Sequence, residues 1–261
     1  MKRRPLLTNM IVKERIEFIT HWIKSYADQY DINRLVVGVS GGIDSAVVST
    51  LCAATGLPTT VLSMPIRQKQ EQQELGINHC LRLMEHFMNV HWETIELTEL
   101  YETFERLFPA DNMLALANSR ARLRMTTLYQ VAQEKAGIVV GTGNKVEDFG
   151  VGFYTKYGDG GVDISPIGDC LKTEVWEMGE ALGVSQDIIK ATPTDGLWDD
   201  NRTDEDQLGM TYPELEKAML QHEQNITPID ATEIENLTKF LAIKEKTQHK
   251  MEPIPVCILG E

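Results

Sequence analysis

The first half of the chain alternates short apolar runs with longer amphipathic stretches. Apolar residues recur every three to five positions from Ile11 to Tyr26, and this period predicts a helix over residues 9–29. Compact apolar runs predict strands over residues 35–39, 59–64, 90–97 and 138–141. The stretches between them predict helices over residues 43–54, 68–87, 99–107 and 113–135. This rhythm predicts an α/β fold, with a doubly wound, mostly parallel, Rossmann-like sheet flanked by helices.

Two segments of the second half lack an apolar period. Residues 142–170 contain seven glycines, so we expect no regular element there, and residues 193–208 are acidic and loop-like. Both are candidate lids over an active site, and Trp198 in the second is a candidate to touch a ligand ring. Helices are expected over residues 172–182, 212–222 and 231–247, followed by a proline-containing tail with His249 and Lys250. No linker divides the chain, so we predict a single domain over residues 1–261.

Composition narrows the class of protein. The 261 residues are 42% hydrophobic, enough for one large buried core. The formal net charge of −14 disfavours nucleic acid as a partner, because phosphate binding needs clustered Lys and Arg. The four cysteines form no C-x-x-C pair, which argues against zinc and a disulfide framework. No run approaches the roughly 18 apolar residues of a membrane span, so we expect a soluble, cytoplasmic protein.

The strongest chemical signal lies between the first predicted strand and the helix after it. Two glycines let backbone N–H groups approach an anion closely, and the helix N-terminus attracts negative charge. Asp44 beside a phosphate requires a cation between them, which implies magnesium. No lysine follows the glycines, so this is not the P-loop of other nucleotide hydrolases. The segment consists of Gly38, Val39, Ser40, Gly41, Gly42, Ile43, Asp44 and Ser45.

A second signal follows the fourth predicted strand, in Gly141-Thr142-Gly143-Asn144-Lys145-Val146-Glu147. The carboxyl ends of parallel strands meet at one edge of the sheet, where ligands bind in such folds. Glu147 is therefore a candidate second carboxylate on the cation near Asp44. Lys172 begins a predicted helix, where the helix dipole disfavours cations, so we expect an anionic ligand beside it.

These motifs resemble those of a known family. Ser-Gly-Gly-Ile-Asp-Ser resembles the pyrophosphate-binding loop of the ATP pyrophosphatase superfamily, whose members split ATP between its α and β phosphates. Residues 141–147 and the segment from Phe153 to Ile167 resemble those of NAD synthetases, and the resemblance covers residues 36 to 255. The chain is therefore identified as a member of the ammonia-dependent NAD synthetases.

The resemblance implies a ligase that uses magnesium. Its substrates would be ATP, deamido-NAD and ammonia, and an adenylated carboxylate would form on the way to NAD, AMP and pyrophosphate. Only 34 residues precede the first predicted strand, so we expect no glutaminase domain and free ammonia as the nitrogen donor. The family also implies a homodimer, for which the Arg-rich helix over residues 113–135 is our candidate interface.

The resemblance also implies roles for individual residues. Asp44, Lys172 and Asp163 would be catalytic, and Asp44 and Glu147 would hold the metal. The ATP contacts would be residues 38–45, Thr142, Lys172 and Thr194. The deamido-NAD contacts would be Arg122, Lys156, Asp163, His249 and Lys250. Two departures from the family pattern stand out: residues 148–152 are one longer than in some bacterial members, and Arg120 replaces a common lysine.

Two other functions compete with this interpretation. A tRNA-modifying member of the same superfamily is opposed by the negative charge, the missing C-x-x-C and the lack of a basic tract. A module that binds ATP without turnover is opposed by the retention of both Asp44 and Glu147.

Overall fold

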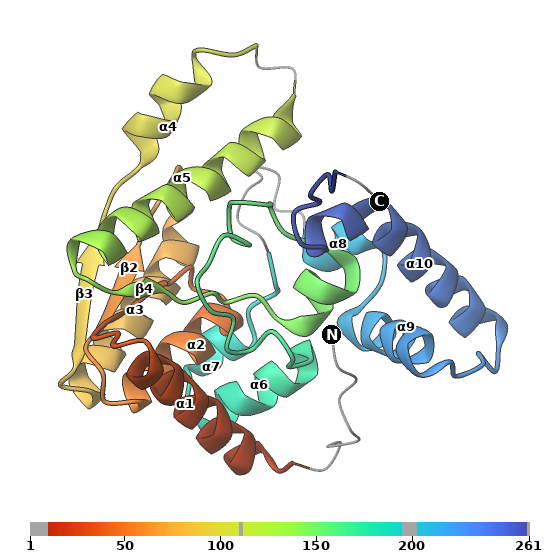
Figure 1. Cartoon of the computed structure of the whole chain (residues 1–261), viewed down its shortest axis with the longest axis horizontal. Coiled ribbons are helices and arrows are strands. Elements are labelled where there is room, and N and C mark those ends of the chain that lie inside the picture. The colour runs from red at the N-terminus through yellow and green to blue at the C-terminus, as the bar shows by residue number, and fades with distance from the viewer. Residues whose placement is uncertain (1–9, 110–111, 195–202, 260–261) are drawn as a thin grey trace.

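The strands form one parallel sheet (Figure 1). The computed structural model describes residues 10–109, 112–194 and 203–259. Within those ranges the sheet has the order β3-β2-β1-β4, and all its pairings are parallel. The strands are β1 (Leu35–Gly38), β2 (Thr59–Ser63), β3 (Val90–Thr94) and β4 (Ile138–Val139). All are at their predicted places and end one to three residues earlier than predicted.

Helices cover both faces of the sheet, because the strand residues are apolar on both sides. On β1, Leu35 and Val37 join the larger core cluster, whereas Val36 between them joins the smaller one on the opposite face. The larger cluster packs against α1 (Val12–Gln29), α2 (Ile43–Ala54), α3 (Gln70–His86) and α6 (Lys172–Ala181). The smaller cluster packs against α4 (Thr98–Glu105) and α5 (Met113–Glu134). The predicted doubly wound fold is confirmed.

The strand order places a functional edge between β1 and β4. From β1 the chain steps outward to β2 and β3, then crosses back through α4 and α5 and adds β4 on the other side of β1. The segments that leave β1 and β4 therefore diverge at the carboxyl edge, which is where open α/β sheets bind ligands. Residues 40–45 and 142–147, the two segments with predicted chemistry, both begin there.

A third core cluster holds the second half of the chain to the sheet. It contains Val146, Tyr212, Leu215 and Phe240, and joins α9 (Tyr212–Gln224) and α10 (Ala231–Met251) to a π-helix, η1 (Lys145–Val151). The prediction that residues 142–170 carry no regular element is wrong for η1. The Asn144 side chain accepts hydrogen bonds from the amides of Val146 and Glu147 and starts the helix. Gly152 ends it with a positive φ of 62°.

Three other helical segments differ from the prediction. The acidic stretch after residue 202 contains α8 (Asp204–Leu208), capped by the Thr203 hydroxyl. The short helix α7 (Gln186–Ile189) was not predicted. The last helix extends four residues beyond 247, so His249 and Lys250 lie in α10 and not in a tail. Trp198 lies outside the described residues.

The described helices include none that is both long enough and apolar enough to cross a membrane.

Buried His79 predicts a pH dependence of stability. Its Nε2 lies 2.9 Å from the Ser49 hydroxyl in the contact between α3 and α2. Burial, with a smaller effect of Arg82, lowers the pKa of His79 from 6.5 to about 4. The unfolded chain therefore binds a proton more readily between these pH values, and the folded state loses stability as pH falls from 6.5 toward 4.

We expect His79→Gln to remove this dependence. Urea unfolding near pH 7.5 and near pH 5 should show that the wild type loses roughly 2 kcal/mol more than the variant over this interval. Equal losses in the two proteins would contradict a neutral, buried His79, whatever the stability of the variant at neutral pH.

Candidate active site

The loop from Ser40 to Ser45 connects β1 to α2 and closes tightly on itself. The Ser45 hydroxyl accepts from the Ser40 amide at 3.2 Å and donates to the Gly42 carbonyl at 2.9 Å. Gly41 has a φ of 90°, and a Cβ there would lie 2.7 Å from the Gln72 carbonyl oxygen of α3. Only glycine lets the loop pass α3 so closely. The N-cap, Gly42, has no side chain to bond the first amides of α2, so these amides are available to an anion.

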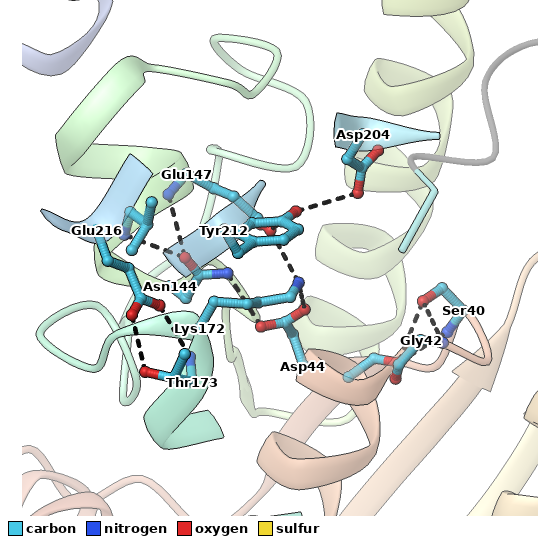
Figure 2. Close-up of polar contacts among 12 residues, drawn as sticks. Ser40, Gly42, Asp44, Asn144, Glu147, Lys172, Thr173, Asp204, Tyr212 and Glu216 are labelled. Atoms are coloured by element: carbon cyan, nitrogen blue, oxygen red, sulfur yellow. Dashed lines mark hydrogen bonds and ion pairs between the residues drawn. The ribbon is translucent and has the colours of Figure 1, made fainter. Parts of the chain in front are cut away.

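Lys172, the first residue of α6, lies between the two predicted metal ligands (Figure 2). Its Nζ donates to Asp44 Oδ2 at 2.6 Å and to Glu147 Oε1 at 2.8 Å. The Lys172 side chain is only 3% exposed, and the two carboxylates are 17% and 16% exposed. The fold therefore brings Asp44, Glu147 and Lys172 together as one buried ion cluster.

Neighbouring polar groups hold this cluster in place. The Asn144 amide donates to Asp44 Oδ1 at 3.1 Å, while its carbonyl oxygen caps η1. The Tyr212 hydroxyl donates to Glu147 Oε1 at 2.6 Å, and the Lys172 ammonium lies 4.8 Å from the centre of the Tyr212 ring. Asp204, at the start of α8, lies 3.3 Å from the same hydroxyl. Figure 2 shows these side chains converging from α2, η1, α6, α8 and α9.

The groups of the cluster shift one another's pKa values, and for Asp44 burial outweighs Lys172 and leaves the pKa above its ordinary value. Burial by itself lowers the pKa of Lys172, but Asp44 and Glu147 more than offset this effect and raise the pKa above its ordinary value. Burial raises the pKa of Glu147, yet Lys172 and Tyr212 outweigh it and the pKa lies below its ordinary value. Lys172 therefore stays an ammonium and Glu147 stays a carboxylate at neutral pH.

A cavity of about 490 Å³ opens over the ion cluster and over residues 40–45, the predicted phosphate-binding loop, called the phosphate loop below. This volume is in the range of small-molecule sites. All residues predicted to contact ATP line it, namely residues 38–45, Thr142, Lys172 and Thr194. Met64, Met125 and Leu128 give part of the wall an apolar surface suited to a flat ring. The cavity thus combines a loop whose helix amides have no side-chain cap, a buried cation and an apolar wall.

Four of the residues predicted to contact deamido-NAD lie together outside this cavity. Arg122 Nε donates to the Lys156 carbonyl at 3.3 Å, and Lys156 Nζ donates to the His249 carbonyl at 3.2 Å. Lys250 Nζ donates to the carbonyls of Gly152 and of Tyr154, the latter at 2.7 Å. These contacts place three cationic side chains and His249 where α5, α10 and residues 152–157 meet.

The structure places Asp163 apart from the cavity. Its Oδ2 accepts from the Val139 amide at 2.7 Å, and its Oδ1 accepts from the Tyr129 hydroxyl at 3.1 Å. Both carboxylate oxygens therefore bond groups of β4 and α5. In this arrangement Asp163 anchors the segment after the glycine-rich turn, and its catalytic role stays a prediction.

Sequence reasoning missed several polar residues of the site. Asp148, Asp159 and Asp204 line the cavity, and Tyr212 and Asn144 bond the ion cluster. Burial raises the pKa of Asp159 to about 6 and, with help from Asp159, raises the pKa of Asp148 well above its ordinary value. Asn144 and Asp159 lie within the sequence motifs described above, so the motifs could have pointed to them. Tyr212 and Asp204 lie in no motif, so the sequence around them does not mark them as site residues.

The residues at the site fit the magnesium that the sequence implies. Magnesium in nucleotide sites uses one or two protein carboxylates and completes its shell with phosphate oxygens and water. Asp44 and Glu147 supply that pair, and one ammonium group already bridges them. Among the residues that the structure describes, no set of three or more His, Cys, Asp and Glu side chains is arranged to hold a metal. The pair would therefore depend on nucleotide oxygens to complete the shell.

Solved structures share this fold. The structure of NMN synthetase from Francisella tularensis is 33% identical, has a TM-score of 0.82, and covers 95% of this chain and 99% of its own. The NH3-dependent NAD synthetase from Campylobacter jejuni has a TM-score of 0.77 at 24% identity, covering 95% of this chain and all of its own. The latter likeness supports the fold alone.

Sequence comparison identifies the family. The NH(3)-dependent NAD(+) synthetase of Carboxydothermus hydrogenoformans is 36% identical over 245 residues, which are 91% of this chain and 94% of that relative. The enzyme of the same name from Methanosarcina acetivorans is 33% identical over 246 residues, 91% of this chain and 95% of that relative. The model of the NAD synthase family matches residues 15–254. The family inferred from the motifs is confirmed, and the chain belongs to the NAD synthase family.

Proposed function

We propose that this chain makes NAD from deamido-NAD, ATP and ammonia in the cavity at the carboxyl edge of the sheet. The observation that carries the proposal is the convergence of the phosphate loop, Lys172 and two carboxylates on that one cavity. The relatives that match over nine-tenths of the chain bear the name of this activity. We also propose that it works in the cytoplasm.

The reaction needs an activated carboxylate, because a carboxylate oxygen is a poor leaving group. An oxygen of the nicotinate carboxylate attacks the α-phosphorus of ATP, and the bond from that phosphorus to the β-phosphate oxygen breaks. Ammonia then attacks the carbonyl carbon, AMP leaves with the oxygen, and the nitrogen loses a proton. Residues 40–45 hold the phosphates through backbone amides, and Lys172 stabilises negative charge on the departing pyrophosphate.

Asp44 and Glu147 would hold the magnesium ion. Bound there, it would supply positive charge to the phosphate oxygens as a Lewis acid. Asn144 and Tyr212 orient the two carboxylates through hydrogen bonds of 3.1 Å and 2.6 Å. Hydrogen bonds of this kind to a metal-binding carboxylate fix the orientation of its oxygens before the metal binds.

We propose that deamido-NAD extends beyond the cavity of about 490 Å³, toward the basic group of Arg122, Lys156 and Lys250 outside it. Gly158, Asp159 and Gly161 line the cavity close in sequence to Lys156. We propose that the nicotinate end enters past this turn while Arg122, Lys156 and Lys250 face the phosphates of deamido-NAD. The carboxyl groups of Asp148 and Asp159 line the cavity and give it oxygen acceptors for the hydrogens of ammonia.

Asp44→Asn tests the metal role, because it keeps the side-chain shape and removes the charge. We expect NAD formation from deamido-NAD, magnesium ATP and ammonium to fall at least a hundredfold, which corresponds to about 2.7 kcal/mol of lost charge stabilisation. Circular dichroism checks the fold of the variant. Glu17→Gln, at an exposed acid of α1, is the control and should keep full activity. A loss below tenfold in Asp44→Asn would contradict the metal role.

A mononucleotide is a second candidate substrate, because the F. tularensis structure with a TM-score of 0.82 is named an NMN synthetase. The same cavity chemistry serves both acceptors, since each presents a nicotinate carboxylate. We expect kcat/KM for deamido-NAD to exceed that for nicotinate mononucleotide at least tenfold, because the basic group around Lys156 contacts only the longer molecule. Lys156→Met should reduce this preference. A higher kcat/KM for the mononucleotide would reverse the assignment.

We also propose a homodimer through the start of α5. Leu107, Phe108, Met113 and Leu114 are each about half exposed or more, which a lone chain rarely leaves uncovered over one stretch. Sedimentation equilibrium should give twice the mass of the 29.4 kDa chain, and Leu114→Glu should weaken association at least tenfold. Met88→Glu, at a fully exposed methionine after α3, should leave it unchanged. A monomeric wild type at micromolar concentration would contradict the proposal.

A further inference from the structure

One lysine already occupies the place of a metal ion between Asp44 and Glu147. The ammonium lies 2.6 Å from Asp44 Oδ2 and 2.8 Å from Glu147 Oε1, so each carboxylate gives it one oxygen (Figure 2). The Tyr212 ring lies against the ammonium and the Lys172 side chain is almost completely buried. Lys172 thus neutralises two buried carboxylates that would otherwise repel each other.

An ammonium and a magnesium ion cannot share these two oxygens. Magnesium would need an oxygen of Asp44 at roughly 2.1 Å, and both oxygens of that carboxylate already accept hydrogen bonds, Oδ2 from Lys172 and Oδ1 from Asn144. Two cations that close also repel strongly in a site with little water. The Lys172 amine must therefore leave at least one carboxylate before a metal can bridge the pair.

The open side of Lys172 faces the nucleotide cavity. Lys172 lines that cavity together with the phosphate loop, Ser40 to Ser45. Phosphate oxygens bound to this loop would be the anions closest to Lys172. They can replace a carboxylate as the hydrogen-bond partner of its ammonium group. Without such an anion, a departing Lys172 would be an unpaired charge in a buried site, which is costly.

Resting on the proposed function, we propose that Lys172 is an internal cation that keeps the Asp44–Glu147 pair closed to magnesium until nucleotide phosphates draw it away. Free magnesium then binds weakly to the protein alone, and the metal enters with ATP. The device prevents a site with two acids from filling with metal in the absence of substrate.

The test measures magnesium binding without nucleotide. Lys172→Met keeps the length of the side chain and removes its charge. Isothermal titration with magnesium chloride alone should show at least tenfold tighter binding to Lys172→Met than to the wild type. Arg15→Met is the matched control. Arg15 lies in α1 and forms an ion pair of 2.7 Å with Glu174, which is in α6 like Lys172. The substitution therefore removes one positive charge next to α6 but away from the cavity. Its magnesium affinity should equal that of the wild type.

The outcomes separate the two proposals. Equal magnesium affinity for the wild type and Lys172→Met would overturn the role of Lys172 while leaving the metal site in place. If magnesium binds neither protein, even with α,β-methylene-ATP, the metal site and the role of Lys172 both fall. Should Lys172→Met not fold, a crystal structure of the wild type with magnesium and this analogue decides. Nζ withdrawn from at least one carboxylate supports the proposal, and Nζ still bridging both overturns it.

Discussion

The buried ion cluster of Lys172, Asp44 and Glu147 is the interaction on which the site depends. Each member comes from a different element, and each would be expensive to bury alone. Their positions are therefore fixed jointly: α2 carries one acid, η1 carries the other, and the first turn of α6 carries the cation. The cluster joins the helix after the phosphate loop to the glycine-rich segment, and all three of its side chains line the cavity.

The topology of the sheet makes this meeting possible. The chain forms β2 and β3 on one side of β1 and then adds β4 on the other side. The segments that follow β1 and β4 therefore start next to each other at the carboxyl edge of the sheet and diverge there. The close pass of the phosphate loop along α3 at Gly41 then sets the direction in which the α2 amides point. The uncapped amides of α2 and the pairing of Asp44 with Glu147 through Lys172 are consequences of this one crossing.

The chain after β4 has a supporting role, although its described residues form no strand. Its core cluster packs Tyr212, Leu215 and Phe240 against Val146 in η1, so α9 and α10 support the π-helix from behind. The same Tyr212 directs its hydroxyl at Glu147, and Thr247 of α10 donates to the Val151 carbonyl at 2.7 Å. A glycine-rich segment that could adopt many conformations is thus held in one by contacts distant in sequence.

The sequence alone determined the elements and motifs whose causes are local. We could predict the strands, the amphipathic helices and the phosphate loop, because each depends on the pattern of apolar residues or glycines within a few positions. The family could be inferred from short motifs for the same reason. Only the tertiary structure decided the rest. Lys172 and Asp44 are 128 residues apart, Tyr212 has no neighbouring motif, and Asp163 bonds β4 and α5 in place of the cavity. Contacts between residues far apart in the sequence produce no periodic pattern along the chain, so the sequence does not reveal them. The π-helix depends on contacts of this kind.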